Sequence, residues 1–279
     1  MIDAHQHYLD PDKGDYPWIA GVLEPLRRTY GPTDLRPALD AHGVEGTIVV
    51  QARTELVETD ALLRIAAADP LTVGVVGWVD LTDPAVGDTL AALLARPDAD
   101  RLVGIRHPAL DEPDPDWLAR PDVGRGLRAL TVAGLTFDLL VRSRELPVAL
   151  RMVRDHPELT FVIDHLAKPP IAGGGLEPWA SLIRPFAACD NVAVKVSGLV
   201  TEADWQAWRP ADLAPFVEVA LEAFGPDRLL FGSDWPVCLL AASYEQVVSA
   251  FHEALGGLSP SEQSAVYGGT ASRVYGLSR

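Results

Sequence analysis

The chain has 279 residues, of which 48% are hydrophobic and 22% are charged, a composition typical of a folded globular protein and not of a disordered one. Its formal net charge of −16 argues against nucleic acid as a partner, because a phosphate backbone is bound through a basic face. The same charge disfavours an anionic membrane surface, and no apolar run is long enough to predict a transmembrane helix.

The cysteines and the first residues of the chain bear on its compartment. Cys189 and Cys238 are the two cysteines, and neither belongs to a CxxC pair, so no disulfide scaffold is expected. Two buried thiols in a reducing cytosol are the simplest interpretation. The N-terminal sequence MIDAHQH lacks the basic and apolar regions of a secretory signal. We therefore predict a cytoplasmic protein.

Eight short runs rich in β-branched residues are predicted to be strands. They span residues 1–5, 46–51, 72–79, 102–107, 135–141, 159–165, 191–197 and 228–233. Most of these runs are apolar throughout instead of alternating, which is typical of strands covered on both faces. Segments with helical spacing lie between them, at 55–68, 84–95, 122–133, 146–156, 176–188, 210–224 and 244–255, and a last helix is predicted over 259–275.

This alternation of strands and helices predicts a parallel α/β fold. Eight units over 279 residues average about 35 residues each, which fits a (β/α)8 TIM barrel formed by residues 1–279 as a single domain. The first connection, 8–32, is long, as binding loops often are. A doubly wound open sheet is the alternative, but it normally places a glycine-rich phosphate turn after an early strand, and the first strand here ends in His-Gln-His.

Residues at the C-terminal ends of barrel strands face the active site, so these positions carry the functional predictions. His5 and His7 lie two residues apart on the first strand and therefore share one face. Two imidazoles in this arrangement suit a divalent metal, with His165 and Asp234 as further ligands after the sixth and eighth strands. An aspartate at this position can also act as the general base toward water.

Other strand-end residues are candidates for binding a substrate. Arg106 either clamps a substrate oxygen or forms a strand-end salt bridge, and Gln51 either hydrogen-bonds a hydroxylated ligand or is structural. Trp18 and Trp78 either stack on a sugar ring or belong to the core. His107 and Lys195 also lie at strand ends.

Three aspartates receive structural predictions. Asp3 lies two residues before His5, so it is expected to share the face of the histidine pair. Asp138 lies inside the fifth strand and needs a polar partner if it is buried. Asp164 is expected to point away from the pocket, because it alternates with His165.

Several of these residues belong to motifs that resemble the amidohydrolase superfamily, in its amidohydrolase 2 branch of sugar-lactonase-like proteins. The resemblance covers almost the whole chain and rests on DAHQH at 3–7, DYPW at 15–18, VVQA at 49–52, GVVGWVDL at 74–81, GIRH at 104–107, GLTFDLLV at 134–141, VIDHLAKPP at 162–170, NVAVKVSGL at 191–199 and FGSDWPVC at 231–238. The branch is similar to L-fuconolactonase, L-rhamnono-lactonase and pyrone-dicarboxylate lactonase. One departure is Gly-Gly-Thr at 268–270, where relatives tend to have Gly-Asn-Ala.

The resemblance implies roles for individual residues. His5, His7, His165 and Asp234 would form the polar core of the site, with Asp234 as the base that activates water. Arg106 and Lys195 would bind the substrate carbonyl or its substituents. Some members of the family hold one divalent ion, usually zinc, and others hydrolyse lactones without a metal. No lysine stands at the end of the fourth strand to bridge two ions, so a binuclear centre is not expected.

We therefore predict a hydrolase that opens a sugar lactone, preferably a neutral aldono-lactone, to the open-chain acid. A zinc-dependent decarboxylase of the same superfamily and a non-catalytic sugar-binding barrel are the alternatives. A metal-dependent deoxyribonuclease fits less well, because of the negative charge and because the fourth strand lacks a glutamate. The sequence leaves open whether the chain forms a homo-oligomer.

Overall fold

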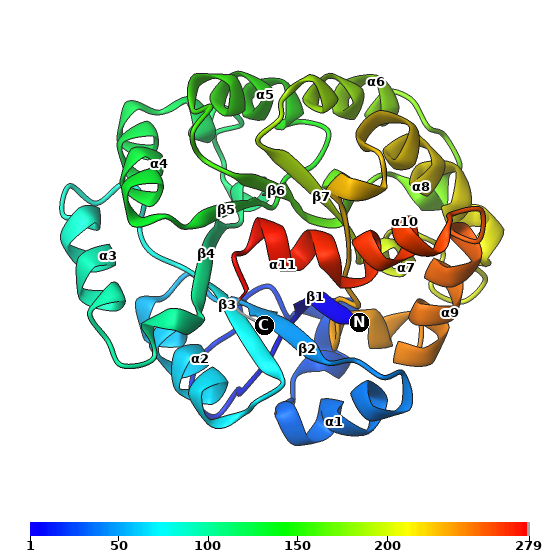
Figure 1. The fold of residues 1–279 in the computed structure, drawn as a ribbon, viewed down its shortest axis with the longest axis horizontal. Helices are drawn as coiled ribbons and strands as arrows, with labels where there is room; N and C mark the ends of the chain where they lie inside the picture. Colours follow the sequence, from blue (N-terminus) through cyan, green and yellow to red (C-terminus); the bar gives the residue numbers. More distant parts are fainter. Residues whose placement is uncertain (278–279) are drawn as a thin grey trace.

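A ring of eight parallel strands forms the centre of the computed structural model, which describes residues 1–277 (Figure 1). The strands are β1 (Ile2–Gln6), β2 (Gly46–Val50), β3 (Thr72–Gly77), β4 (Leu102–His107), β5 (Thr136–Leu139), β6 (Phe161–Ile163), β7 (Val192–Val196) and β8 (Leu229–Phe231). Each strand pairs with the next one in the sequence. This order confirms the predicted TIM barrel and rules out the doubly wound sheet.

The ring closes through the segment that follows β8. The amide of His7 donates to the carbonyl of Trp235 over 2.7 Å, and the amide of Asp234 donates to the carbonyl of His5 over 2.8 Å. Two backbone hydrogen bonds therefore join the end of β1 to the residues just after the last strand. As a result, the predicted ligands His5, His7 and Asp234 are neighbours along the same edge.

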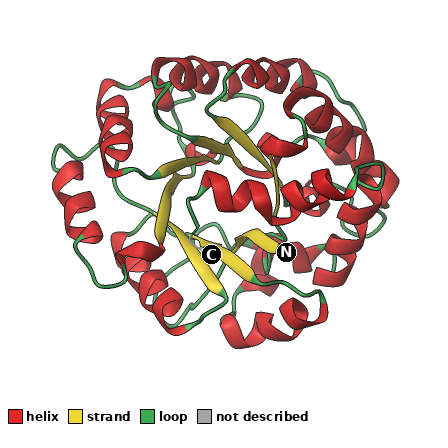
Figure 2. Ribbon diagram, viewed as in Figure 1, coloured by secondary structure: helices red, strands yellow, loops and turns green. Residues whose placement is uncertain are grey.

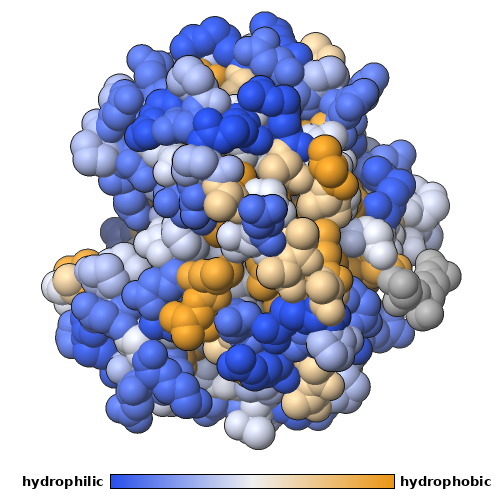
Figure 3. Space-filling model, turned by 90° about the vertical axis from the view of Figure 1, so that its left-hand side faces the viewer, coloured by the Kyte–Doolittle hydropathy of each residue, from blue (hydrophilic) through white to orange (hydrophobic). Residues whose placement is uncertain are grey.

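Helices surround the strands on the outside (Figure 2). They are α1 (Pro32–Ala41), α2 (Leu56–Ala68), α3 (Val86–Leu94), α4 (Pro121–Ala133), α5 (Leu146–Asp155), α6 (Trp179–Ile183), α8 (Pro210–Phe224) and α9 (Tyr244–Ala254), with a short α7 (Leu199–Glu202) after β7. Figure 3 shows one side of the molecule, where hydrophilic residues predominate and apolar ones form small patches. In the described residues no helix is long and apolar enough to cross a membrane.

Apolar side chains fill two layers, which explains why the strands are apolar on both faces. The larger layer lies between the strands and the outer helices. The smaller layer fills the barrel interior and is formed by Ala4, Ile48, Val50, Val76, Val103, Val162, Ala193 and Leu230, together with Ala271 and Tyr275 from the C-terminal segment. The barrel is therefore a packed core below the active site and not a channel.

The C-terminal segment covers the end of the barrel at which the strands begin. The single helix predicted over 259–275 is instead α10 (Pro260–Ser264), a π-helical turn (Ala265–Gly269) and α11 (Thr270–Val274), which crosses the centre of the view in Figure 1. A Cβ on Gly268 would lie 3.3 Å from the backbone nitrogen of Ile2, so this turn approaches the start of β1 closely. The departure at 268–270 thus lies at the opposite end from the predicted chemistry.

Candidate active site

A cavity of about 1090 Å³ opens at the C-terminal ends of the strands. The predicted site residues that line it are His7, Trp18, Gln51, Trp78, Arg106, His107, His165 and Asp234. His5 and Lys195 are fully buried beneath it and do not contribute to its wall. The structure therefore brings the predicted residues to one end of the barrel, but it places Lys195 below the cavity surface.

Three side-chain atoms at or just beneath the cavity floor are spaced like the ligands of one metal ion. The Nε2 atoms of His5 and His7 are 3.2 Å apart, and Asp234 Oδ1 lies 3.4 Å from His7 Nε2 and 3.8 Å from His5 Nε2. Ligands about 2.05 Å from a tetrahedral ion are separated by about 3.3 Å. Burial lowers the pKa of His5 well below its usual value, which leaves a neutral imidazole. The donor set therefore fits a divalent cation.

The two histidines share a face because they lie two residues apart, and the pairing of β1 with β2 shifts its register ahead of them, between Asp3 and Gln6. The same shift removes Asp3 from that face, so the prediction for Asp3 is wrong. Its carboxylate accepts the amide hydrogens of Ser233 and His5, over 2.9 and 3.2 Å, and the hydroxyl of Tyr244 on α9. Burial raises the pKa of Asp3 to about 6. Asp3 therefore ties β1 to α9 and to the segment after β8.

His165 reaches the cavity because the chain leaves β6 earlier than predicted. The strand ends at Ile163, and the backbone from His165 to Lys168 is left-handed, with φ between 51° and 58°. His165 Nδ1 lies 2.9 Å from Ser197 Oγ, and its ring centroid lies 4.4 Å from that of His5. Burial lowers the pKa of His165 to about 4, so the ring is neutral near pH 7.

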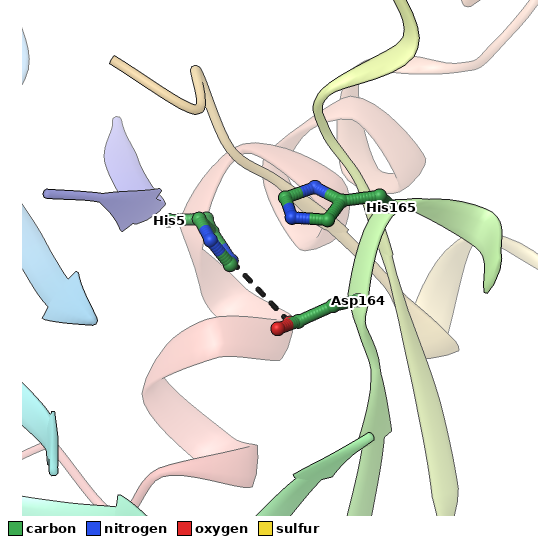
Figure 4. Close-up of side chains that lie close together, drawn as sticks. All are labelled: His5, Asp164 and His165. Atoms are coloured by element: carbon green, nitrogen blue, oxygen red, sulfur yellow. Dashed lines mark ion pairs between the residues drawn. The ribbon is translucent and has the colours of Figure 1, made fainter. Parts of the chain in front are cut away.

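The early end of β6 also changes the direction of Asp164, which was expected to point away from the pocket. Its carboxylate points into the barrel and toward His5 (Figure 4), with 3.3 Å between Asp164 Oδ1 and His5 Nδ1. Arg106 Nη1 lies 3.0 Å from Asp164 Oδ2, and Lys195 Nζ lies 3.0 Å from Asp164 Oδ1. Burial favours the neutral acid, but Lys195, His5 and Arg106 hold the pKa of Asp164 well below its usual value. The prediction failed because strict alternation requires a continuing strand.

Asp234 follows β8 with φ of 57°, and this left-handed backbone turns its carboxylate toward the histidines. Burial disfavours its charged form, but His165 and a hydrogen bond from His7 hold the pKa of Asp234 below its usual value. Gly198 lies against this pair. A Cβ on Gly198 would be 2.6 Å from His165 Nδ1 and 2.9 Å from Asp234 Oδ2. The site thus contains an ionised carboxylate beside neutral imidazoles.

Arg106 and Gln51 form a reciprocal pair at the ends of β4 and β2. Arg106 Nη2 donates to the carbonyl of Gln51, and Gln51 Nε2 donates to the carbonyl of Arg106 over 3.3 Å. Arg106 Nη1 also donates to Asp164 over 3.0 Å and lies 3.3 Å from His5 Nε2. The guanidinium therefore lies at the cavity floor, directly beside the candidate metal ligands.

Aromatic side chains form one wall of the cavity. Trp78 Nε1 donates to His107 Nδ1 over 3.1 Å, which leaves His107 Nε2 to donate to Glu112 over 2.8 Å. Trp117 stacks on His107 with centroids 4.1 Å apart and 8° between the planes. Trp18 Nε1 donates to the carbonyl of Ala52. All four rings line the cavity, and the ring nitrogens of Trp18, Trp78 and His107 bond to protein groups.

Sequence reasoning missed several residues of the site. Trp117 lies in a 3-10 turn within the β4–α4 connection, where no periodic pattern marks it. Arg53 and Glu202 line the cavity from the β2–α2 loop and from α7. Considering only the residues at strand ends identifies the floor of a barrel site, but it misses the residues of the loops above that floor. Asp138, in contrast, has the partner that its burial requires, because Lys195 Nζ lies 2.5 Å from its Oδ2.

Comparisons with known proteins give three findings. A curated L-fucono-1,5-lactonase from Burkholderia multivorans is 41% identical over 287 residues, covering 99% of this chain and 96% of that protein. The crystal structure of an amidohydrolase from B. multivorans with bound zinc is 40% identical, with a TM-score of 0.93 and 99% of each chain covered. A 2,6-dihydroxybenzoate decarboxylase from Rhizobium shares the fold alone, at 16% identity, a TM-score of 0.69 and coverage of 99% of this chain and 98% of that one.

A family model described as amidohydrolase matches residues 2–277, nearly the whole chain. The match agrees with the closed barrel, the buried histidine pair and the aspartate after the last strand. It confirms the resemblance inferred from the motifs. The chain therefore belongs to the amidohydrolase family, in the branch matched by this model.

Proposed function

We propose that this protein is a lactonase, a hydrolase that opens the cyclic ester of an aldono-lactone to the corresponding acid. The observation that carries this proposal is the cluster of His5, His7 and Asp234, in which His7 and Asp234 line a large cavity and His5 lies buried beneath them. The activity named for its curated relative supports the enzyme class that the sequence predicts. The decarboxylase alternative rests on a shared fold alone.

Asp234 is the general base of the proposed reaction. Its carboxylate is ionised, because its pKa is held below the usual value, and it lies at the cavity floor. It takes a proton from water as the water attacks the lactone carbonyl, and the protonated acid then returns the proton to the leaving alkoxide. Arg106 and His165 lie beside it and stabilise the charge that develops on the carbonyl oxygen, where each aimed donor contributes about 3 kcal/mol.

We propose zinc as the ion held by His5, His7 and Asp234, with His165 at the edge of the same cluster. The spacing of the donor atoms, the imidazole ligands and the zinc-bound relative support this choice. When bound, zinc polarises a carbonyl oxygen and lowers the pKa of water. Because some lactonases of this kind act without a metal, dependence on zinc is part of the test.

The cavity favours a neutral hydroxylated ring over a carboxylated one. Each cationic side chain that lines it already has a carboxylate partner, in pairs that include Arg106 with Asp164, Lys168 with Glu202 and Arg142 with Glu202. A dicarboxylate would need unpaired cations, whereas a sugar ring can lie against Trp18 and Trp78 and bond to Gln51. The lactone is the only partner we propose; a cytoplasmic location and a homo-oligomeric state stay predictions.

A panel of 1,4- and 1,5-aldonolactones, followed by acid release with and without chelator, tests the proposal. We expect turnover of at least one neutral lactone, loss of turnover after chelation and recovery with Zn²⁺. Release of CO2 from a carboxylated substrate, or binding of a sugar lactone without turnover, would overturn it in favour of the decarboxylase or the sugar-binding barrel.

Asp234→Asn tests the base directly. Asparagine keeps the shape of the side chain but cannot accept a proton, so kcat should fall by about a thousandfold, within the range attributed to general bases. Asp88→Asn, an exposed aspartate on α3, is the control and should keep wild-type kcat. Turnover of the Asp234 variant within threefold of wild type would remove this residue as the base.

A further inference from the structure

Three charged side chains from different connections meet in the lining of the active-site cavity. Lys168 Nζ donates to Glu202 Oε1 over 2.6 Å, and Arg142 Nη1 donates to Glu202 Oε2 over 3.5 Å. Glu202 ends α7, while Lys168 follows β6 and Arg142 follows β5. One carboxylate therefore links the segments that follow three neighbouring strands.

Glu202 compensates the charge of both cations. Within residues 1–277, neither Lys168 nor Arg142 forms an ion pair with any other carboxylate. The side chains of Lys168 and Glu202 are only 17% and 14% exposed, so solvent screens their attraction less than that of a surface pair. The side chain of Arg142 is 53% exposed, and its pair is screened more. Lys168 is therefore the cation whose charge Glu202 chiefly compensates.

The backbone keeps Lys168 beside the cavity independently of this ion pair. Its φ is 52°, a left-handed conformation that a lysine adopts only where the surrounding structure holds it. Its amide donates to the carbonyl of His165 over 2.8 Å, and two prolines, at positions 169 and 170, follow it. Loss of the Glu202 charge would therefore leave the ammonium within reach of a ligand in the cavity.

A carboxylated ligand would meet charges that already balance in this part of the cavity. Asp111 lines the cavity as well; burial raises its pKa, and the nearby Arg142 and Lys168 act in the opposite direction. Two carboxylates thus lie near two cations. A substrate carboxylate would have to compete with Glu202 for Lys168, and both acidic side chains would repel it. Without the charge of Glu202, the cations would outnumber the carboxylates.

We propose that Glu202 is a specificity-determining residue, whose carboxylate occupies the Lys168 ammonium and thereby restricts the cavity to neutral lactones. Glu202 acts through Lys168 and takes no part in the proton transfers. The kinetic consequence rests on the lactonase activity proposed above, whereas the consequence for the binding of a carboxylated ligand does not depend on that activity. Removal of one negative charge should therefore open the site to lactones that carry a carboxylate.

Glu202→Gln tests the proposal, because it removes the charge and keeps the size of the side chain. Isothermal titration calorimetry with D-glucarate, an open-chain sugar dicarboxylate, measures binding without turnover. We expect a dissociation constant about tenfold lower than that of the wild type, the effect of one hydrogen bond to a charged group. The kcat/KM for D-glucaro-1,4-lactone, relative to that for the neutral lactone turned over fastest, should rise by a similar factor.

Asp80→Asn is the matched control, since it removes the same charge from the lining of the cavity without releasing a cation. Within residues 1–277, Asp80 forms no ion pair, and it accepts the amide hydrogen of Thr82 over 2.8 Å. This variant should bind D-glucarate as the wild type does. Glu202→Gln combined with Lys168→Met should lose most of the gain, because the released ammonium is then absent.

Three results would overturn the proposal. They are wild-type affinity for D-glucarate in folded Glu202→Gln, an equal gain in Asp80→Asn, and a gain that survives Lys168→Met. If Glu202→Gln does not fold, Glu202→Met, which also removes the charge, is the second variant and should tighten D-glucarate binding in the same way. Absence of lactone turnover in the wild type would overturn the proposed function and leave the calorimetric test intact.

Discussion

At the scale of single residues, the site depends on backbone conformations that side chains rarely adopt. His165 and Asp234 are both left-handed, with φ of 54° and 57°, and both lie in the segment that follows a strand, β6 or β8. Such conformations are costly for residues other than glycine, and they persist where the surrounding structure holds them. Here His7 Nε2, 3.4 Å from Asp234 Oδ1, and Ser197 Oγ, 2.9 Å from His165 Nδ1, hold the two side chains in place. The strain is therefore part of how the site is built.

Gly198→Ala should disturb the geometry of the active site more than it destabilises the fold. The new Cβ would lie 2.6 Å from His165 Nδ1 and 2.9 Å from Asp234 Oδ2, so one of these side chains must move. A shift of that size should lower kcat by about a hundredfold. Gly134→Ala is the control, since Gly134 is equally left-handed, with φ of 69°, but has no neighbour within 4 Å of the new Cβ. Equal kcat values for the two variants would contradict this explanation.

The identities of the floor residues could be predicted from the sequence, but the directions of some could not. His5 and His7 were predictable because two residues of one strand share a face, and Asp234 because it directly follows the last apolar run. Asp3 and Asp164 were assigned the wrong directions, since a register shift in β1 and an early end of β6 interrupt the alternation. Such irregularities arise from tertiary contacts, which no local pattern records.

At the scale of elements, α2 organises the loops around the cavity. Glu58 in its first turn accepts the amide hydrogens of Ala52 and Arg53, over 2.9 and 2.7 Å. Arg53 in turn lies over the ring of Tyr16, 5.5 Å from its centroid, and Trp18 donates to the carbonyl of Ala52. One buried carboxylate therefore fixes the β2–α2 loop, and this loop holds the long first connection.

Glu58 should make stability depend on pH. Burial raises its pKa to about 7 from the ordinary 4.5, so between these pH values the unfolded chain loses a proton that the folded chain keeps. The contribution of Glu58 to the free energy of unfolding is complete below pH 4.5. It declines by up to about 3 kcal/mol as the pH rises to 7. Glu58→Gln should remove that decline. Urea unfolding at pH 5 and pH 8 measures it, with Glu55→Gln, an exposed neighbour, as the control.

Helix positions were more predictable than strand ends. The segment 210–224 matches α8 to the residue, because proline begins it and glycine follows it. The segment 259–275 was predicted as one helix, but Gly268 lies against Ile2 and a π-helical turn over Ala265–Gly269 interrupts the helix. Periodicity identifies which faces are buried, whereas close approach between distant segments decides where an element breaks.

At the scale of the whole molecule, one end of the barrel holds the active-site cavity, and the C-terminal segment covers the other end. The cavity and the histidine cluster lie where the strands end, and α11 covers the interior where they begin. Repetition of strand and helix was enough to predict this architecture. The course of the C-terminal segment across the barrel could not be predicted, because it depends on the shape of a space that eight distant strands create together.

A divalent ion that binds only the folded site should stabilise the whole barrel. At a free Zn²⁺ concentration about a hundredfold above the dissociation constant, the gain is about 2.7 kcal/mol, and the Tm should rise by roughly 5 °C. Removing two of the ligands, in His5→Gln combined with His7→Gln, should abolish the rise. Differential scanning fluorimetry with and without chelator measures it, and an equal rise in the double variant would place the ion elsewhere.

The hydrogen bonds that join His5 and His7 to Asp234 and Trp235 also constrain when the protein can become active. During synthesis the imidazole pair is translated long before its carboxylate neighbour, with seven strands of the barrel between them. Domains of this kind fold as units, and an unfinished one exposes an unpaired strand edge. A nascent or prematurely terminated polypeptide therefore has no assembled centre, and turnover begins only once translation has delivered the final strand.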